Sequence, residues 1–209
     1  MNEISFSPNE SRRFDITIYR GQIDEINVDN LRKLIFEKQI DILIVRVPHD
    51  NKSLHYKLTN IGFNCLHADS LVEYSKDISN SLIPNIKNNL EFELITRENS
   101  CLLEKMIPII FQNYQNHYVS NPYLDREKIL QGYVEFAISH ATNFLENKIA
   151  WYVKKNGRMA GFSACSYNED NKECEGVLYG VMPDFTRQKF IQICCAIPSL
   201  ILLIRVLLK

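Results

Sequence analysis

The fold is decided by the stretch IAWYVKKNGRMAGFSACSYNEDNKECEGVLYGV, which spans residues 149–181. Three apolar segments lie within it, at residues 149–154, 159–167 and 176–181. Asn156 and Gly157 separate the first two segments, and an Asn-Gly pair in this position strongly favours a two-residue hairpin turn between strands. The stretch therefore predicts a meander of three antiparallel strands.

A strand and two helices are predicted ahead of the meander. Residues 91–96 favour a short strand, and residues 99–114 place apolar side chains on one face of a helix. Residues 125–140 predict a second amphipathic helix, which Asp125 would cap. We therefore assign residues 89–188 to one domain, with the order strand, helix, helix and three strands.

A smaller βαβαβ module is predicted in residues 1–88. Its expected elements alternate along the chain, with strands at residues 14–19, 40–47 and 64–74 and helices at residues 27–38 and 53–60. The second strand, IDILIVRV, is apolar almost throughout, so we expect it at the centre of a sheet. Residues 75–89 are rich in Ser, Asn and Lys, which favours a connection between the modules. The predicted fold class is α/β (α+β), with a mixed sheet.

Charge and composition narrow the classes of function. Lys and Arg total 24 against 25 for Asp and Glu, so no net positive field favours nucleic acid as a partner. The N-terminal residues lack the apolar segment of a secretory signal, which favours a cytoplasmic protein with free, partly buried cysteines. The histidines lack the spacing of a metal pair, so no metal site is expected. The turn after residues 40–47 lacks glycine, which argues against a nucleotide-binding loop there.

The meander leads into the segment VMPDFTRQ, residues 181–188. This segment and the order of elements before it resemble the N-acetyltransferases of the GNAT family, which use acetyl-CoA. The resemblance implies acetyl-CoA as cofactor, with a pyrophosphate loop that includes Thr186, Arg187 and Gln188. Such a loop suits an anion because backbone N–H groups at a helix N-terminus converge on it. The resemblance also implies that three residues of the last strand offer backbone groups to the acetyl and pantetheine arm: Tyr179, Gly180 and Val181.

Acyl transfer to an amine needs a base that takes the proton of the amine. Glu175 is the candidate base, acting directly or through water, and the alternative is a solvated carboxylate ahead of a strand. Members of the family commonly use a tyrosine beyond the pyrophosphate loop as the acid. No tyrosine follows Tyr179 in this sequence, so that role has no candidate.

The segments at residues 66–77, 116–137 and 176–185, in a chain with a half-module ahead of a larger one, resemble bacterial dTDP-fucosamine acetyltransferases. The resemblance implies a small-molecule amine as substrate, namely a nucleotide-linked amino sugar, and allows a homodimer. Substrate-facing side chains are expected in a loop beside the cofactor strand, at His117, Tyr118, Asn121 and Tyr123. The alternative is that the two tyrosines pack this loop and His117 caps a helix.

Residues 189–209 do not fit the end of a GNAT domain. The family places a glycine after the start of the loop, but Lys189 and Phe190 stand there and no glycine follows. The stretch is mostly apolar, so one interpretation is a C-terminal membrane anchor, although Pro198 and Arg205 are unfavourable within a bilayer. The other interpretation is a frameshift near residue 188 that leaves the GNAT domain incomplete. The chain is therefore an N-acetyltransferase, an inactive truncated remnant of one, or a membrane-tethered module without catalysis.

The frameshift hypothesis predicts what the coding DNA contains. If the codons from residue 189 are regrouped to start on the third base of each triplet, they can encode Ile-Tyr-Ser-Asp-Leu-Leu, which resembles the opening of the GNAT cofactor helix. Sequencing of the gene should show that this alternative frame continues as an amphipathic helix. A stop codon soon after the regrouped codons would contradict the hypothesis.

Overall fold

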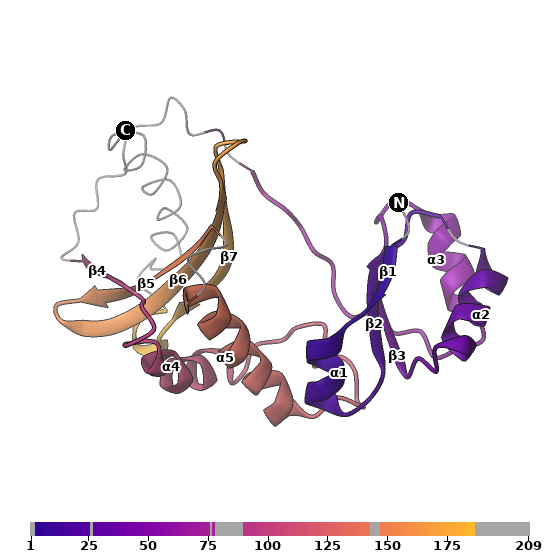
Figure 1. The fold of residues 1–209 in the computed structure, drawn as a ribbon, viewed down its shortest axis with the longest axis horizontal. Coiled ribbons are helices and arrows are strands. Elements are labelled where there is room, and N and C mark those ends of the chain that lie inside the picture. The colour runs from indigo at the N-terminus through magenta and orange to yellow at the C-terminus, as the bar shows by residue number, and fades with distance from the viewer. Residues whose placement is uncertain (1–2, 26, 76, 78–89, 143–146, 187–209) are drawn as a thin grey trace. The chain divides into compact units, whose positions relative to one another are not determined.

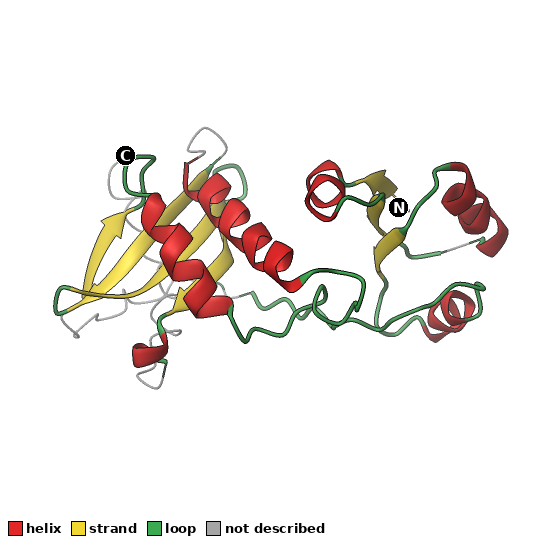
Figure 2. Cartoon of the chain, turned by 90° about the horizontal axis from the view of Figure 1, so that it is seen from below, coloured by secondary structure: helices red, strands yellow, loops and turns green. Residues whose placement is uncertain are grey.

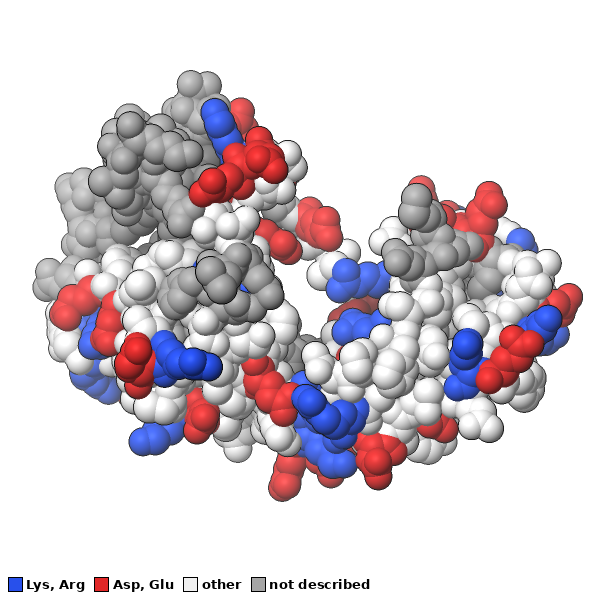
Figure 3. Space-filling view, viewed as in Figure 1, with Lys and Arg blue, Asp and Glu red and all other residues white. Residues whose placement is uncertain are grey.

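The computed structural model describes residues 3–25, 27–75, 77, 90–142 and 147–186. Contacts divide the chain into two compact units, and each is described by itself. Unit 1 contains Met1–Val72 and Gln115–Ile129, and unit 2 contains Glu73–Tyr114 and Leu130–Lys209. Acidic and basic side chains are interspersed on the face that Figure 3 shows, in keeping with their nearly equal numbers.

Unit 1 is built on a three-stranded sheet whose strands alternate with helices (Figure 1). Its elements are β1 (Glu3–Phe6), α1 (Pro8–Phe14), β2 (Ile18–Gln22), α2 (Val28–Glu37), β3 (Ile42–Arg46) and α3 (Lys52–Thr59). The strand order is β1-β2-β3, and β2 runs antiparallel to β1 and parallel to β3. Side chains of α2 and α3 form the core of this unit, among them Leu31, Leu54 and Leu58.

Four of the five elements predicted for this module form close to their predicted residues, as β2, α2, β3 and α3, and β1 and α1 precede them. β1 and α1 form within residues 3–14, a stretch almost entirely outside the predicted elements. The strand predicted at residues 64–74 is wrong, because these residues form no strand and all of them are exposed. Their irregular alternation provides no continuous apolar face, and a strand gains its stability from a buried face and a paired neighbour.

The middle strand of the described sheet is β2 and not β3. The apolar sequence of residues 40–47 predicted a central strand, and this prediction is wrong: no residue of β3 is fully buried. An apolar sequence indicates that the side chains of a strand can be buried. It does not indicate how many neighbouring strands pair with the backbone, because that depends on the rest of the chain.

Unit 2 contains a four-stranded antiparallel sheet with helices packed on it (Figure 2). Its elements are β4 (Leu90–Leu94), α4 (Cys101–Phe111), most of α5 (Arg126–Thr142), β5 (Lys148–Lys155), β6 (Arg158–Asn168), β7 (Glu173–Val181) and a short 3₁₀ helix, η2 (Pro183–Phe185). The strand order is β4-β5-β6-β7. The predicted strand, helices and meander are confirmed. Asp125 caps α5 as predicted, since its carboxylate accepts hydrogen bonds from the backbone N–H groups of Glu127 and Lys128.

The Asn-Gly pair forms the predicted hairpin turn between β5 and β6. Asn156 and Gly157 have φ values of 51° and 72°, in the left-handed region that this turn requires. The turn sets the register beside it, where Lys155 faces Arg158. A β-bulge at Ala160 then shifts the register by one residue and places Tyr152 opposite Phe162. Both rings are fully buried in the core that α4 and α5 form with this face of the sheet.

None of the helices in the described ranges is long and apolar enough to cross a membrane. Residues 189–209, for which a membrane anchor and a frameshift were the two interpretations, lie outside the described residues.

Candidate functional site

The outer edge of β7 is the first candidate site. Among the described strands, β7 pairs only with β6. Just beyond the strand, the backbone N–H of Met182 donates a hydrogen bond to the carbonyl oxygen of Ala160 at 2.8 Å. Hydrogen-bonded and non-bonded residues alternate along an antiparallel ladder, so Val181 and Tyr179 direct their backbone N–H and C=O groups away from β6. These are two of the three residues for which the resemblance implied backbone contacts with a cofactor.

Gly180, the third of these residues, serves the packing of the sheet. Its place in the ladder directs its backbone groups toward β6. A Cβ atom at Gly180 would overlap the ring of Phe162, and a Cβ at Gly161 would overlap the carbonyl oxygen of Gly180. Glycine at both positions therefore lets the two strands and the Phe162 ring approach closely.

A β-bulge lies three residues before Gly180. Ala164 and Cys165 of β6 face Leu178 and Gly176 of β7, so the intervening Val177 has no partner in the register. A bulge bends its strand and changes the direction of the backbone groups that follow. The bulge at Val177 thus affects the direction of the backbone groups of Tyr179 and Val181, which precede the predicted pyrophosphate loop.

The described part of the predicted pyrophosphate loop is a tight turn. One residue, Met182, separates η2 from β7, and Phe185 within η2 is buried. Thr186 is exposed and its hydroxyl donates to the carbonyl oxygen of Pro183 at 3.0 Å. Arg187 and Gln188 lie outside the described residues. The phosphate-binding role predicted for these three residues stays a prediction.

Glu175, the candidate base, lies on β7 with its side chain exposed. It is paired across the strands with Ser166. The hydroxyl of Ser166 is 2.9 Å from Nε2 of His140, a buried residue of α5. The structure thus brings a carboxylate, a hydroxyl and an imidazole into neighbouring positions. His140 was missed as a candidate because 26 residues separate it from Ser166 in the sequence.

The predicted substrate segment packs within unit 1. Tyr118 donates a hydrogen bond to the carboxylate of Glu10, a residue of α1 that is only 5% exposed. Arg20 of β2 reaches the same carboxylate at 3.1 Å and the Tyr118 hydroxyl at 3.3 Å. Burial, and then the hydrogen bond to Glu10, raise the pKa of Tyr118 far above its usual value. The hydroxyl of Tyr118 is therefore committed to a buried ion pair.

Two of the other predicted substrate residues also have partners within unit 1. The side-chain oxygen of Asn121 accepts a hydrogen bond from the backbone N–H of Tyr123, which forms a local turn. Nδ1 of His117 lies 3.4 Å from the carboxylate of Asp69, and its buried Nε2 has no described partner. Burial lowers the pKa of His117, and the carboxylate of Asp69 opposes this shift. Tyr123 is 77% exposed, so its ring is accessible to a ligand.

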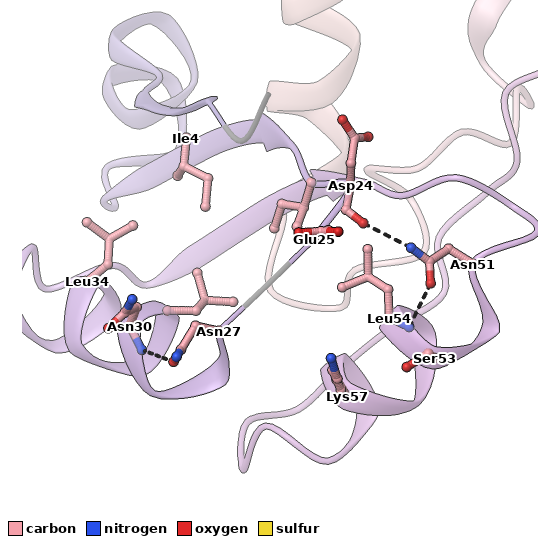
Figure 4. Close-up of a pocket in the computed structure, with 12 residues that line it drawn as sticks. Ile4, Asp24, Glu25, Asn27, Asn30, Leu34, Asn51, Ser53, Leu54 and Lys57 are labelled. Atoms are coloured by element: carbon pink, nitrogen blue, oxygen red, sulfur yellow. Dashed lines mark hydrogen bonds between the residues drawn. The ribbon is translucent and has the colours of Figure 1, made fainter.

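A surface hollow of about 780 Å³ lies elsewhere in unit 1 (Figure 4). It is bordered by the N-terminal ends of α2 and α3, which would attract an anion if their backbone N–H groups were available. The side-chain oxygens of Asn27 and Asn51 already accept hydrogen bonds from these groups. Asp24 and Glu25 on its rim add negative charge. The hollow is therefore poorly suited to a pyrophosphate.

No metal centre is found in the described ranges, where no cluster of three or more His, Cys, Asp or Glu side chains could hold an ion.

Comparison with known proteins gives little support for an assignment. No family model matches the chain, and no curated protein matches it. Among solved structures, the chain is similar to one from Desulfovibrio desulfuricans that is assigned to the GNAT family of acetyltransferases. The two are 10% identical, with a TM-score of 0.37, and the match covers 56% of this chain and 67% of the other. A likeness at this level is too low to bear on the activity.

The Tyr118–Glu10 contact predicts a stability difference between two tyrosine variants. Tyr118→Phe removes a donor to a buried carboxylate, so it should lower the free energy of unfolding by about 1–3 kcal/mol. Tyr123→Phe changes an exposed ring and should stay within about 0.5 kcal/mol of the wild type. Urea unfolding followed by circular dichroism measures both. Equal midpoints for Tyr118→Phe and the wild type would show that the contact does not stabilise the fold.

Proposed function

We propose that this protein is an N-acetyltransferase that uses acetyl-CoA. The observation that carries the proposal is the outer edge of β7, where the ladder with β6 directs the backbone groups of Val181 outward. An extended ligand with amide groups can pair with such an edge as an added strand. The pantetheine arm of acetyl-CoA has this chemistry, so the residues fit this part of the cofactor. The residues proposed for its pyrophosphate lie largely beyond Thr186.

The residues around β7 can serve acyl transfer in two ways. Acetyl-CoA supplies an activated acetyl group when it is bound. The outward N–H of Val181 can donate a hydrogen bond to the thioester oxygen, which gains negative charge during the reaction. Stabilisation of this charge is the largest contribution to catalysis in many acyl transfers. Glu175 can take the proton of the attacking amine, since its carboxylate is exposed to an incoming substrate.

The proposed acceptor is a nucleotide-linked amino sugar. Its support is the resemblance of residues 66–77 and 116–137 to acetyltransferases that act on such sugars. Tyr123 offers an exposed ring that can stack on a sugar or a base, whereas the Tyr118 hydroxyl is held by Glu10. We therefore propose Tyr123 as the acceptor contact of this segment. A cytoplasmic location accords with this metabolite class and belongs to the same proposal.

Binding of acetyl-CoA to the purified protein tests the proposal. A ligand that binds only the folded state raises its stability, so acetyl-CoA should raise the melting temperature in a saturable manner. At a concentration about 100 times the dissociation constant, the gain is about 2.7 kcal/mol. ATP, which carries phosphates and adenine without the pantetheine amides, should protect much less. Absence of any shift at millimolar acetyl-CoA would leave only the non-catalytic alternatives, a remnant or a tethered module.

The variant Val181→Pro tests the edge itself. Proline removes the outward N–H but is tolerated on an edge strand where that group is not part of the ladder. The variant should therefore keep a melting temperature near that of the wild type and lose most of the protection by acetyl-CoA. Protection equal to that of the wild type would move the cofactor site away from β7.

A pair of carboxylate variants tests the proposed base. Glu175→Gln should lower kcat/KM by about 100-fold or more, because the amide cannot take a proton. Glu173→Gln is a matched control, since Glu173 is exposed on the same strand two residues earlier. Release of the coenzyme A thiol with a panel of amines, including nucleotide-linked amino sugars, measures both variants. Equal kcat/KM values for the two would remove Glu175 from the reaction.

A further inference from the structure

Two cysteines lie together on the face of the β6–β7 pair that faces away from α4 and α5. Cys165 is fully buried, in a cluster with Val153, Ala160 and Phe185. Cys174 is half-buried and packs against the same cluster. Both cysteines are free thiols. Neither has a role in the acyl transfer proposed above.

The strand register places the two side chains next to each other. Cys165 is paired with Gly176, and Cys174 precedes Gly176 by two residues, so the two cysteines share one face on a diagonal between neighbouring strands. Cβ atoms on such a diagonal lie about 7 Å apart or somewhat closer, and a disulfide needs about 3.5–4.5 Å, so a link between them requires a local shift of β6 and β7 beside the bulge. Gly176 has no side chain between them, and the hydroxyl of Tyr179 occupies the space where its Cβ would point. The two thiols are therefore neighbours, with the hydroxyl of Tyr179 beside them.

Hydrogen bonds of the pair support this placement. Cys174 shares a hydrogen bond with Cys165, which lowers the pKa of Cys165 and raises that of Cys174. The hydroxyl of Ser163 lies 3.6 Å from the sulfur of Cys165. The first proton lost comes from the pair, and the hydrogen bond from Cys174 stabilises the thiolate that forms at Cys165. Of the two, Cys174 is the one that a reagent can reach.

We propose that Cys165 and Cys174 form a dithiol site that closes to an intramolecular disulfide by exchange with small disulfides such as oxidised glutathione. Cys174 passes its proton to the Cys165 thiolate through their hydrogen bond, and its sulfur attacks the small disulfide, forms a mixed disulfide and releases one small thiol. The sulfur of Cys165 then attacks the sulfur of Cys174 and releases the second small thiol. Two protein thiols are oxidised, the small disulfide is reduced to two thiols, and the two protons pass to these products.

The link would join β6 to β7 across the hairpin of residues 165–174. It would lie beside the bulge at Val177 and in contact with Tyr179, so it would restrain β7 relative to β6. This inference rests on the register and packing of the two cysteines. It does not depend on acetyl-CoA binding, and its test can fail while the proposed function holds.

Peptide mapping of the full chain tests the proposal. The reduced native protein is incubated with oxidised glutathione, its remaining thiols are alkylated in urea, and it is digested with trypsin. Cys165 then lies in the peptide of residues 159–172 and Cys174 in that of residues 173–187, each with a single cysteine. We expect these two peptides to be joined by a disulfide. Glutathione attached to the exposed Cys65 and Cys101 shows in the same sample that the reagent was active.

Two variants assign the roles of the thiols. In Cys165→Ser, glutathione should stay attached to Cys174, because the second attack is lost. In Cys174→Ser, the buried Cys165 should stay unmodified until the protein is unfolded. Formation of the link should raise the melting temperature of the wild type by about 5–10 °C, since it closes a short loop in the unfolded chain.

The proposal is overturned if Cys65 and Cys101 react while the two peptides remain separate. It is also overturned if the link forms only in urea, where the register of β6 and β7 is lost. Both comparisons use the wild-type chain, so they decide the matter even if Cys165→Ser fails to fold.

Discussion

The pairing of β6 with β7 is the constraint on which most of the functional features depend. Its register determines which backbone groups of β7 face outward, where the bulge at Val177 lies, and which side chains meet on each face. Gly161 and Gly180 hold this register, because a side chain at either position would collide with the neighbouring strand or the Phe162 ring. A shift by one residue would exchange the two faces and bury the wrong set of side chains.

The two faces of this strand pair have different chemistry. On the side covered by α4 and α5, Phe162 and Ala164 enter the main core, and Ser166 meets His140 at the end of the same row. On the other side, Ser163, Cys165, Cys174 and Tyr179 form a small cluster with polarisable and hydroxyl groups. The outer edge adds backbone groups at Val181. One hairpin thus carries a candidate base at Glu175, a candidate cofactor edge and a dithiol, because alternation along a strand separates them in space.

In unit 1, a buried carboxylate has a comparable organising effect. Glu10 accepts hydrogen bonds from Ser7, Arg20 and Tyr118, and these donors come from a position ahead of α1, from β2 and from the segment that follows α4. A buried carboxylate without such donors would be strongly unfavourable, so the fold requires each of these side chains to point toward Glu10. The requirement explains why a tyrosine that looked like a substrate contact in the sequence is directed inward. It leaves the exposed Tyr123 as the more accessible aromatic side chain of the segment.

The sequence by itself determined the local elements whose signals are short in range. The Asn-Gly turn, the amphipathic helices and the Asp125 cap depend on residues within a few positions of each other, and the meander follows from them. Only the tertiary structure decided the contacts between distant residues. The Glu10–Tyr118 bond joins residues 108 positions apart, the His140–Ser166 contact depends on α5 lying over the sheet, and the edge position of β3 depends on β1. The physical reason is that the local sequence determines which side chains can be buried or can form hydrogen bonds, whereas the packing of the whole chain determines which residues become their partners.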